Sequence, residues 1–125
     1  MSQTDTLRLS LQTCVFSSGA VALTYTLISR ARCTTRVECH RVLGIVATRR
    51  GDAAAAEVAF LAGAEDARGC GLYLLELLCA RDLVQFVYEG QGRAAEGEAM
   101  IEAAAGRMGK ERADFDALLS ARREW

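Results

Sequence analysis

Apolar residues recur along most of the chain at the three- and four-residue spacing of amphipathic helices, and glycines separate the periodic segments. Gly51-Asp52 predicts the end of one helix and the N-cap of the next, because Gly tolerates a left-handed exit and Asp accepts free backbone N–H groups. Apolar side chains surround segment 72–88 almost completely, which predicts a central, buried helix. The expected helices span 53–68, 72–88, 93–108 and 110–123, after one that ends at Arg50.

The segment before residue 37 fits more than one structure. Phe16, Ala20, Leu23 and Leu27 form a helical seam, but alternate residues from Val21 to Leu27 also follow the period of a strand. In an otherwise helical chain we expect helix here, as one long helix or as a hairpin that turns near Ser17-Ser18. The uncharged stretch 9–29 suggests a membrane segment, but its many Ser and Thr residues argue against one.

Two units share one form, an apolar helix, a glycine turn and an Ala-rich helix, with turns at Gly51 and Gly92. In segment 37–70, Leu43-Gly44 precedes Gly51-Asp52, and Ala56 and Phe60 follow four residues apart. This order resembles the tetratricopeptide repeat, whose signature is a Leu-Gly pair, a Gly-Asp-type turn, a small residue and an aromatic residue four later. A second copy places Tyr88, Gly92, Gly97, Ile101 and Ala104 in register, with Val84-Gln85 in place of Leu-Gly.

The resemblance implies an all-α fold, in which antiparallel helical hairpins stack as a short right-handed solenoid of five to six helices. We expect one domain over 1–125. Its parts are a degenerate N-terminal hairpin or long helix over 1–36, the best repeat over 37–70, a second, longer hairpin over 71–109 and a capping helix over 110–125.

In tetratricopeptide arrays, the first helix of each hairpin lines a concave groove that holds a peptide or helix of a partner protein. Carried over to this chain, the partner-binding residues are Glu38, Arg41, Ile45, Arg49, Asp82, Phe86 and Glu89. Arg41 and Arg49 would pair with acidic groups, and Phe86 would anchor an apolar one. The same periodicity also allows Ile45 and Phe86 to be core residues.

Composition fits a soluble domain, because 51% of the residues are hydrophobic and 25% are charged. The net charge of −1 argues against a dedicated binder of nucleic acid or anionic membrane. Residues 1–50 nevertheless carry an excess of Arg, so RNA binding by this half is a third hypothesis. Five cysteines in no disulfide pattern predict reduced thiols and a cytoplasmic location.

No pattern of catalytic or metal-binding residues stands out. The only His, His40, is adjacent to Cys39, and helical neighbours point about 100° apart, so the two cannot form a nucleophile–base pair. Cys33 would lie about 10 Å away along a helix, too far to share a metal ion. We therefore predict a non-catalytic adaptor without metal or cofactor. The alternative is a structural subunit or homo-oligomer that associates through apolar helices such as 72–88.

Overall fold

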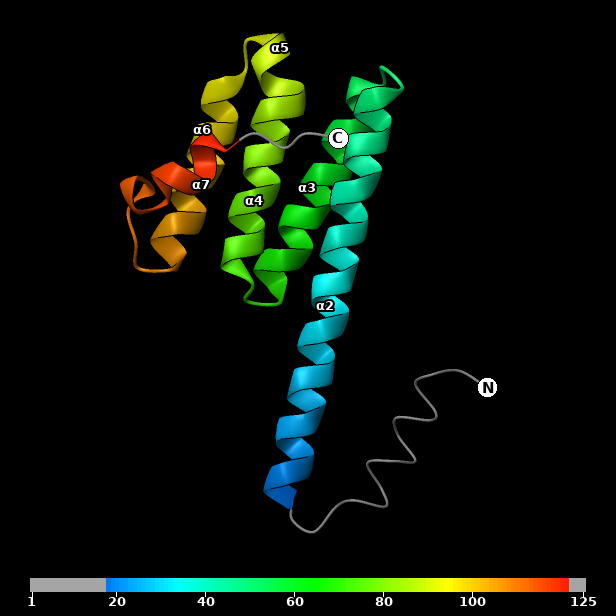
Figure 1. Cartoon of the computed structure of the whole chain (residues 1–125), viewed down its shortest axis with the longest axis vertical. Helices are drawn as coiled ribbons and strands as arrows, with labels where there is room; N and C mark the ends of the chain where they lie inside the picture. Colours follow the sequence, from blue (N-terminus) through cyan, green and yellow to red (C-terminus); the bar gives the residue numbers. More distant parts are fainter. Residues whose placement is uncertain (1–17, 122–125) are drawn as a thin grey trace. The chain divides into compact units, whose positions relative to one another are not determined.

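The computed structural model describes residues 18–121, and all the regular elements in that range are helical (Figure 1). They are α2 (Ser18–Arg49), α3 (Ala53–Gly69), α4 (Tyr73–Leu83), a π-helical turn η1 (Val84–Tyr88), α5 (Glu89–Gln91), α6 (Ala94–Arg107), a 3-10 turn η2 (Arg112–Phe115) and α7 (Asp116–Ser120). The predicted all-α class is thus confirmed for the described part of the chain. Within that part, no helix is long and apolar enough to cross a membrane.

By its internal contacts the chain divides into two compact units, 1–32 and 33–125, and the expectation of a single domain stays a prediction. The described part of the first unit is helical and exposes Leu23 and Leu27. The expected turn at Ser17 and the end of the expected capping helix, beyond residue 121, lie outside the described residues. The core and the surfaces discussed below belong to the second unit.

The second unit is built from antiparallel neighbours, with α3 packed between α2 and α4, and α4 packed between α3 and α6 (Figure 1). The turns follow the predicted chemistry: Gly51 and Gly92 have φ of 75° and 70°, a region that other residues rarely adopt. Asp52 caps α3 as expected, because its carboxylate accepts the Ala55 N–H at 3.1 Å.

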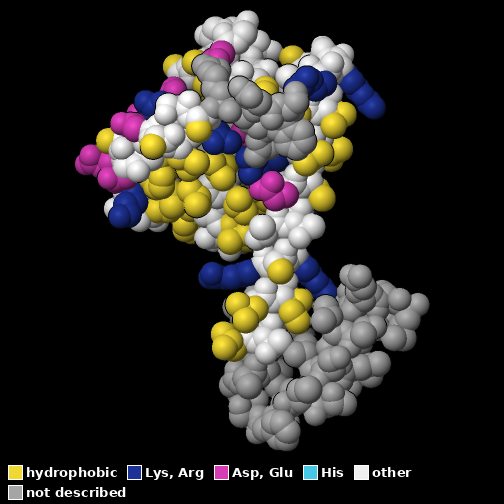
Figure 2. Space-filling view, in the orientation of Figure 1, with side chains coloured by type: hydrophobic (Ala, Val, Ile, Leu, Met, Phe, Trp, Pro, Cys, Tyr) yellow, Lys and Arg dark blue, Asp and Glu magenta, His cyan; other side chains and the backbone are white. Residues whose placement is uncertain are grey.

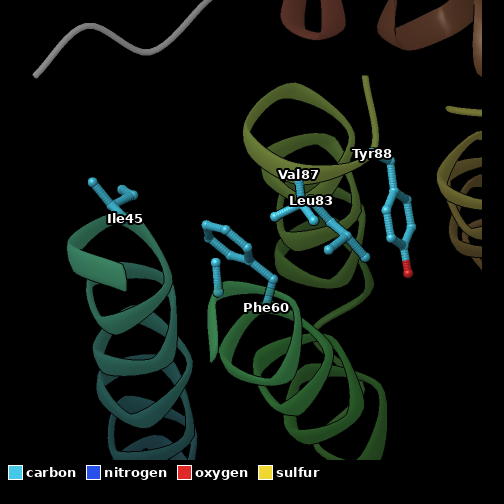
Figure 3. Packing of buried hydrophobic residues seen from close by; sticks show 6 residues of the cluster. Ile45, Phe60, Leu83, Val87 and Tyr88 are labelled. Carbon is cyan, nitrogen blue, oxygen red and sulfur yellow. The ribbon is translucent and has the colours of Figure 1, made fainter. Parts of the chain in front are cut away.

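The central core forms where Phe60 of α3 meets α2 and α4. Its ring lies between Ile45 on one side and Leu83 with Val87 on the other (Figure 3). Gly44 makes this approach possible, since a Cβ atom there would lie 2.6 Å from two ring carbons of Phe60. The glycine of the Leu43-Gly44 pair and the aromatic residue Phe60, both parts of the repeat signature, are therefore packing partners.

A second core cluster joins α4 to α6 and to the C-terminal turn. Val84 of the π-turn sits so close to Gly97 that a Cβ atom at Gly97 would overlap its side chain. Partly buried Phe115, Leu118 and Leu119 pack against this cluster, so the C-terminal segment covers it. The predicted helix 110–123 is observed as η2 followed by the short α7.

Candidate functional site

Three of the residues predicted to face a partner are buried, and their expected outward orientation is wrong. Arg41, Ile45 and Asp82 are 3%, 4% and 0% exposed. Ile45 belongs to the Phe60 core, which is the alternative that the periodicity had left open. Arg41 Nε donates to Asp82 Oδ2 at 2.9 Å, so this pair joins α2 to α4 inside the protein.

The buried arginine keeps its charge because carboxylates surround it. Burial alone would lower the pKa of Arg41, but Asp82 and Glu38 together raise it above its ordinary value. Glu38 accepts from Arg41 Nη1 at 2.6 Å, and Arg81 lies 3.2 Å from the second oxygen of Asp82. The predicted groove charges Glu38, Arg41 and Asp82 therefore pair with one another, and Arg81 balances the remaining negative charge.

The remaining predicted residues lie at the surface or at the edge of the core. Phe86 is partly buried and stacks on Phe60, with ring centroids 6.1 Å apart and planes 13° from parallel. Arg49 and Glu89 are exposed. A role for these three residues in binding a partner stays a prediction.

A different surface, the groove between α2 and α3, gathers exposed apolar side chains. Leu43 is 58% exposed, Val46 39% and Val58 68%. The groove has a volume of about 890 Å³, and small residues line the rest of it, namely Ala47, Ala54, Ala55, Ala59 and Ala62. Hydrophobic side chains also reach the surface beside the upper part of α2 and over α4 in the space-filling view (Figure 2). We call the surface between α2 and α3 the α2–α3 groove.

Polar groups mark the two ends of the α2–α3 groove. Arg50 and Asp52 lie at the end where α2 turns into α3. At the other end, His40 Nε2 lies 3.0 Å from Asp66 Oδ2, and the same oxygen accepts from Arg36 Nε at 3.0 Å. Asp66 of α3 therefore binds two side chains of α2 and holds the two helices together at this end of the groove.

Sequence reasoning missed this groove because it placed the binding face of α2 at Arg41, Ile45 and Arg49, whereas Leu43 and Val46 line the groove. The available signal was the run Ala53–Ala56, whose lack of bulk lets another backbone approach α3. A helix with small side chains on one side and Phe60 on the other has two faces to cover, and α4 covers only one of them.

A polar cluster of Glu57, Tyr88 and Arg93 joins α3 to the residue that precedes α6. The Tyr88 hydroxyl donates to Glu57 Oε1 at 2.9 Å, and Arg93 donates to both oxygens of Glu57. Burial, followed by the Glu57 contact, raises the pKa of Tyr88 to about 12. Hydrogen bonds from Arg93 and Tyr88 lower the pKa of Glu57. Each group is satisfied by its neighbours, which is typical of a structural cluster.

The expectation that the cysteines are reduced is wrong for one pair. Cys33 of α2 and Cys70 at the end of α3 form a disulfide, with Cα atoms 6.5 Å apart. Cys39 and Cys79 form no disulfide; the first is exposed and the second is buried. The cytoplasmic location rested on reduced thiols, so it loses that support and stays a prediction.

Within residues 18–121, no three side chains of His, Cys, Asp or Glu are grouped so that they could hold a metal ion. His40 is engaged with Asp66 rather than with a nucleophile. The α2–α3 groove therefore offers an apolar surface with charged ends, which suits recognition of a helix. Comparison of the chain with protein-family models, with curated proteins and with solved structures finds no match.

Proposed function

We propose that this protein is a non-catalytic interaction module, a short solenoid of tetratricopeptide-like hairpins that binds a helix of a partner protein in the α2–α3 groove. The observation that carries the proposal is the exposure of Leu43, Val46 and Val58 in one groove. Full burial of one such side chain contributes about 1.5–3 kcal/mol. Scaled by their exposed fractions, the three contribute about 2–5 kcal/mol when a partner covers them.

The groove has the dimensions of a helix site. From His40 to Arg50 it runs along ten residues of α2, which corresponds to about 15 Å or three helical turns. A partner helix with apolar residues one turn apart can place them between the branched side chains of α2 and the alanines of α3. The site that we propose is therefore the α2–α3 groove, and not the concave face expected from the sequence.

Photo-crosslinking tests this site directly. A benzophenone side chain in place of Val58 should form a covalent adduct with a protein when the full chain is irradiated in its own cells. The same side chain in place of exposed Ala103, on α6 and outside the groove, is the matched control. Adducts at Val58 but not at Ala103 support the proposal. Equal adducts at both positions, or none at Val58, contradict it.

A further inference from the structure

We propose that the occupant of the α2–α3 groove is a partner helix that presents an aromatic residue and, three residues later, a small residue, as α3 does with Phe60 and Gly63. This inference rests on the proposed function, because it names the kind of helix that binds at the same site. It comes from comparing the two hairpins of this chain, α2–α3 and α4–α6. In the second hairpin the face that corresponds to the groove is covered by α3.

The two hairpins have the same turn, which sets their register. After Gly51 and after Gly92, the next N–H group donates at 2.9 Å to the carbonyl five residues earlier. The turns lie 41 residues apart, as do the first residues of α3 and α6. The π-turn η1 adds one residue to the second hairpin, so residues before it correspond at a separation one residue shorter. Leu83-Val84, rather than Val84-Gln85, therefore corresponds to Leu43-Gly44.

In this register both hairpins carry the same stripe of cysteine, leucine and valine. An arginine two residues before the leucine also recurs, and each arginine donates to the first helix of the next unit. Arg41 Nε donates to Asp82 of α4 at 2.9 Å, and Arg81 Nη1 donates to a carbonyl of α7 at 3.3 Å. The stripe is Cys39, Leu43 and Val46 in the first hairpin, and Cys79, Leu83 and Val87 in the second.

In the second hairpin, α3 covers the stripe. Leu83 and Val87 are 0% and 3% exposed because they pack against the ring of Phe60 (Figure 3). Cys79 is fully buried, and its Sγ would lie 3.1 Å from a Cβ atom at Gly63 of α3. An aromatic side chain thus covers the upper two residues, and a residue without a side chain lets α3 approach the third.

In the first hairpin the same stripe is exposed. Leu43 and Val46 line the groove and are 58% and 39% exposed. Cys39 is also exposed and lies one turn from Leu43 on the same face of α2. A partner helix antiparallel to α2 can place its aromatic ring against Leu43 and Val46 and its small residue over Cys39. The α3 helix of a second copy does not suit this role, because its Phe60 is fully buried.

The α3 side of the groove corresponds in the same way. Met100 of α6 packs against the cluster that contains Phe60, and its counterpart in α3, Ala59, lines the groove. Because Ala59 is smaller than Met100, the groove has room for an aromatic ring at least as large as that of Phe60.

A stapled peptide with the sequence of α3 is the probe that tests this inference. It spans residues 53–69, and a hydrocarbon staple between positions 58 and 62 keeps it helical on the side opposite to its phenylalanine. Fluorescence anisotropy with the full chain should show saturable binding. Phe60→Ala in the peptide should weaken binding by about 10- to 100-fold. Gly63→Leu makes the peptide more apolar and a better helix former, yet it should weaken binding by at least about fivefold.

Variants of the full chain locate the binding site. Leu43→Glu should abolish binding of the peptide. Leu74→Glu is the matched control and should bind as the wild type does, because Leu74 is 47% exposed but lies on α4 outside the groove. Circular dichroism confirms that each variant is folded.

Three results overturn the inference: a wild type that does not bind the peptide, binding that Phe60→Ala and Gly63→Leu leave unchanged, or binding that Leu74→Glu abolishes as Leu43→Glu does. If the peptide does not bind but Val58 crosslinks to a protein, only the kind of helix is wrong. If the peptide does not bind and Val58 forms no adduct, the proposed function is wrong as well.

Discussion

Replacing Gly44 by Ala tests the closest approach between α2 and α3. In the structure, the added Cβ atom would lie 2.6 Å from Cε1 and Cζ of Phe60, whereas carbon atoms in contact are comfortable at about 3.5–4.0 Å. The ring must therefore move by about 1 Å. Phe60 is fully buried against Ile45, Leu83 and Val87, so this shift disturbs the core. Overpacking of this kind costs about 1–3 kcal/mol.

A second effect of the substitution has the opposite sign. Ala is a better helix former than Gly by about 1 kcal/mol, and this gain partly conceals the steric cost. Gly106→Ala is the matched control, because Gly106 lies in helix α6 and a Cβ atom there would meet nothing within 4 Å. We expect Gly106→Ala to be neutral or stabilising by up to about 1 kcal/mol. The Gly44→Ala variant should be about 1–3 kcal/mol less stable than this control.

Urea unfolding followed by circular dichroism measures both variants, with the midpoint shifting at an unchanged slope. Repeating Gly44→Ala in a Phe60→Leu background identifies the clash, because removal of the ring should abolish most of the steric cost. If the Gly44 and Gly106 variants are equally stable, or if the cost persists without the ring, then Phe60 does not pack against Gly44 as described here.

Three further changes probe the contacts that hold the helices together. Cys33→Ser removes the disulfide, which closes a loop with a sequence separation of 37, and should lower the free energy of unfolding by roughly 4 kcal/mol in the chain-entropy model. Reduction of the wild type with dithiothreitol should lower its free energy of unfolding to the same value, and a wild type that does not respond to dithiothreitol would contradict the disulfide. Asp82→Ala leaves the buried Arg41 charge with only the partly exposed Glu38 as a partner and should cost about 3–5 kcal/mol in urea unfolding, a cost that Arg41→Met with Asp82→Leu should largely recover. The fold raises the pKa of Tyr88 from 10.0 to about 12, so the unfolded chain loses this proton at lower pH than the folded chain, and the free energy of unfolding should decrease as pH rises from about 10 to 12. Tyr88→Phe should remove this part of the decrease, and identical pH profiles of the variant and the wild type would refute the prediction.

The sequence predicted the helices and their turns well because local chemistry determines them. Gly51 and Asp52 end one helix and cap the next through their own backbone and side-chain preferences, without help from distant residues. The Gly44–Phe60 contact could also be predicted from the sequence, since a small residue and a large one at repeat spacing pack together in helical hairpins.

The site was harder to predict because helical periodicity does not reveal which neighbour covers a face. Arg41 looks like a surface residue by type, and only the position of Asp82 on α4 shows that its charge is compensated inside the protein. The disulfide between Cys33 and Cys70 depends in the same way on how α2 and α3 pair, which no spacing along the chain encodes.

The contacts between α2 and α3 also bear on how so small a surface can bind a partner. The two helices are joined at the disulfide, at Asp66 with His40 and again where Gly44 meets Phe60. The groove between them is therefore formed before any partner arrives, and binding orders few additional groups. Because loss of conformational freedom is a main cost of association, a rigid groove retains more of the 2–5 kcal/mol estimated from its apolar side chains as affinity. Loosening the pairing of α2 with α3 should then weaken binding at the groove even when no residue of the groove is changed.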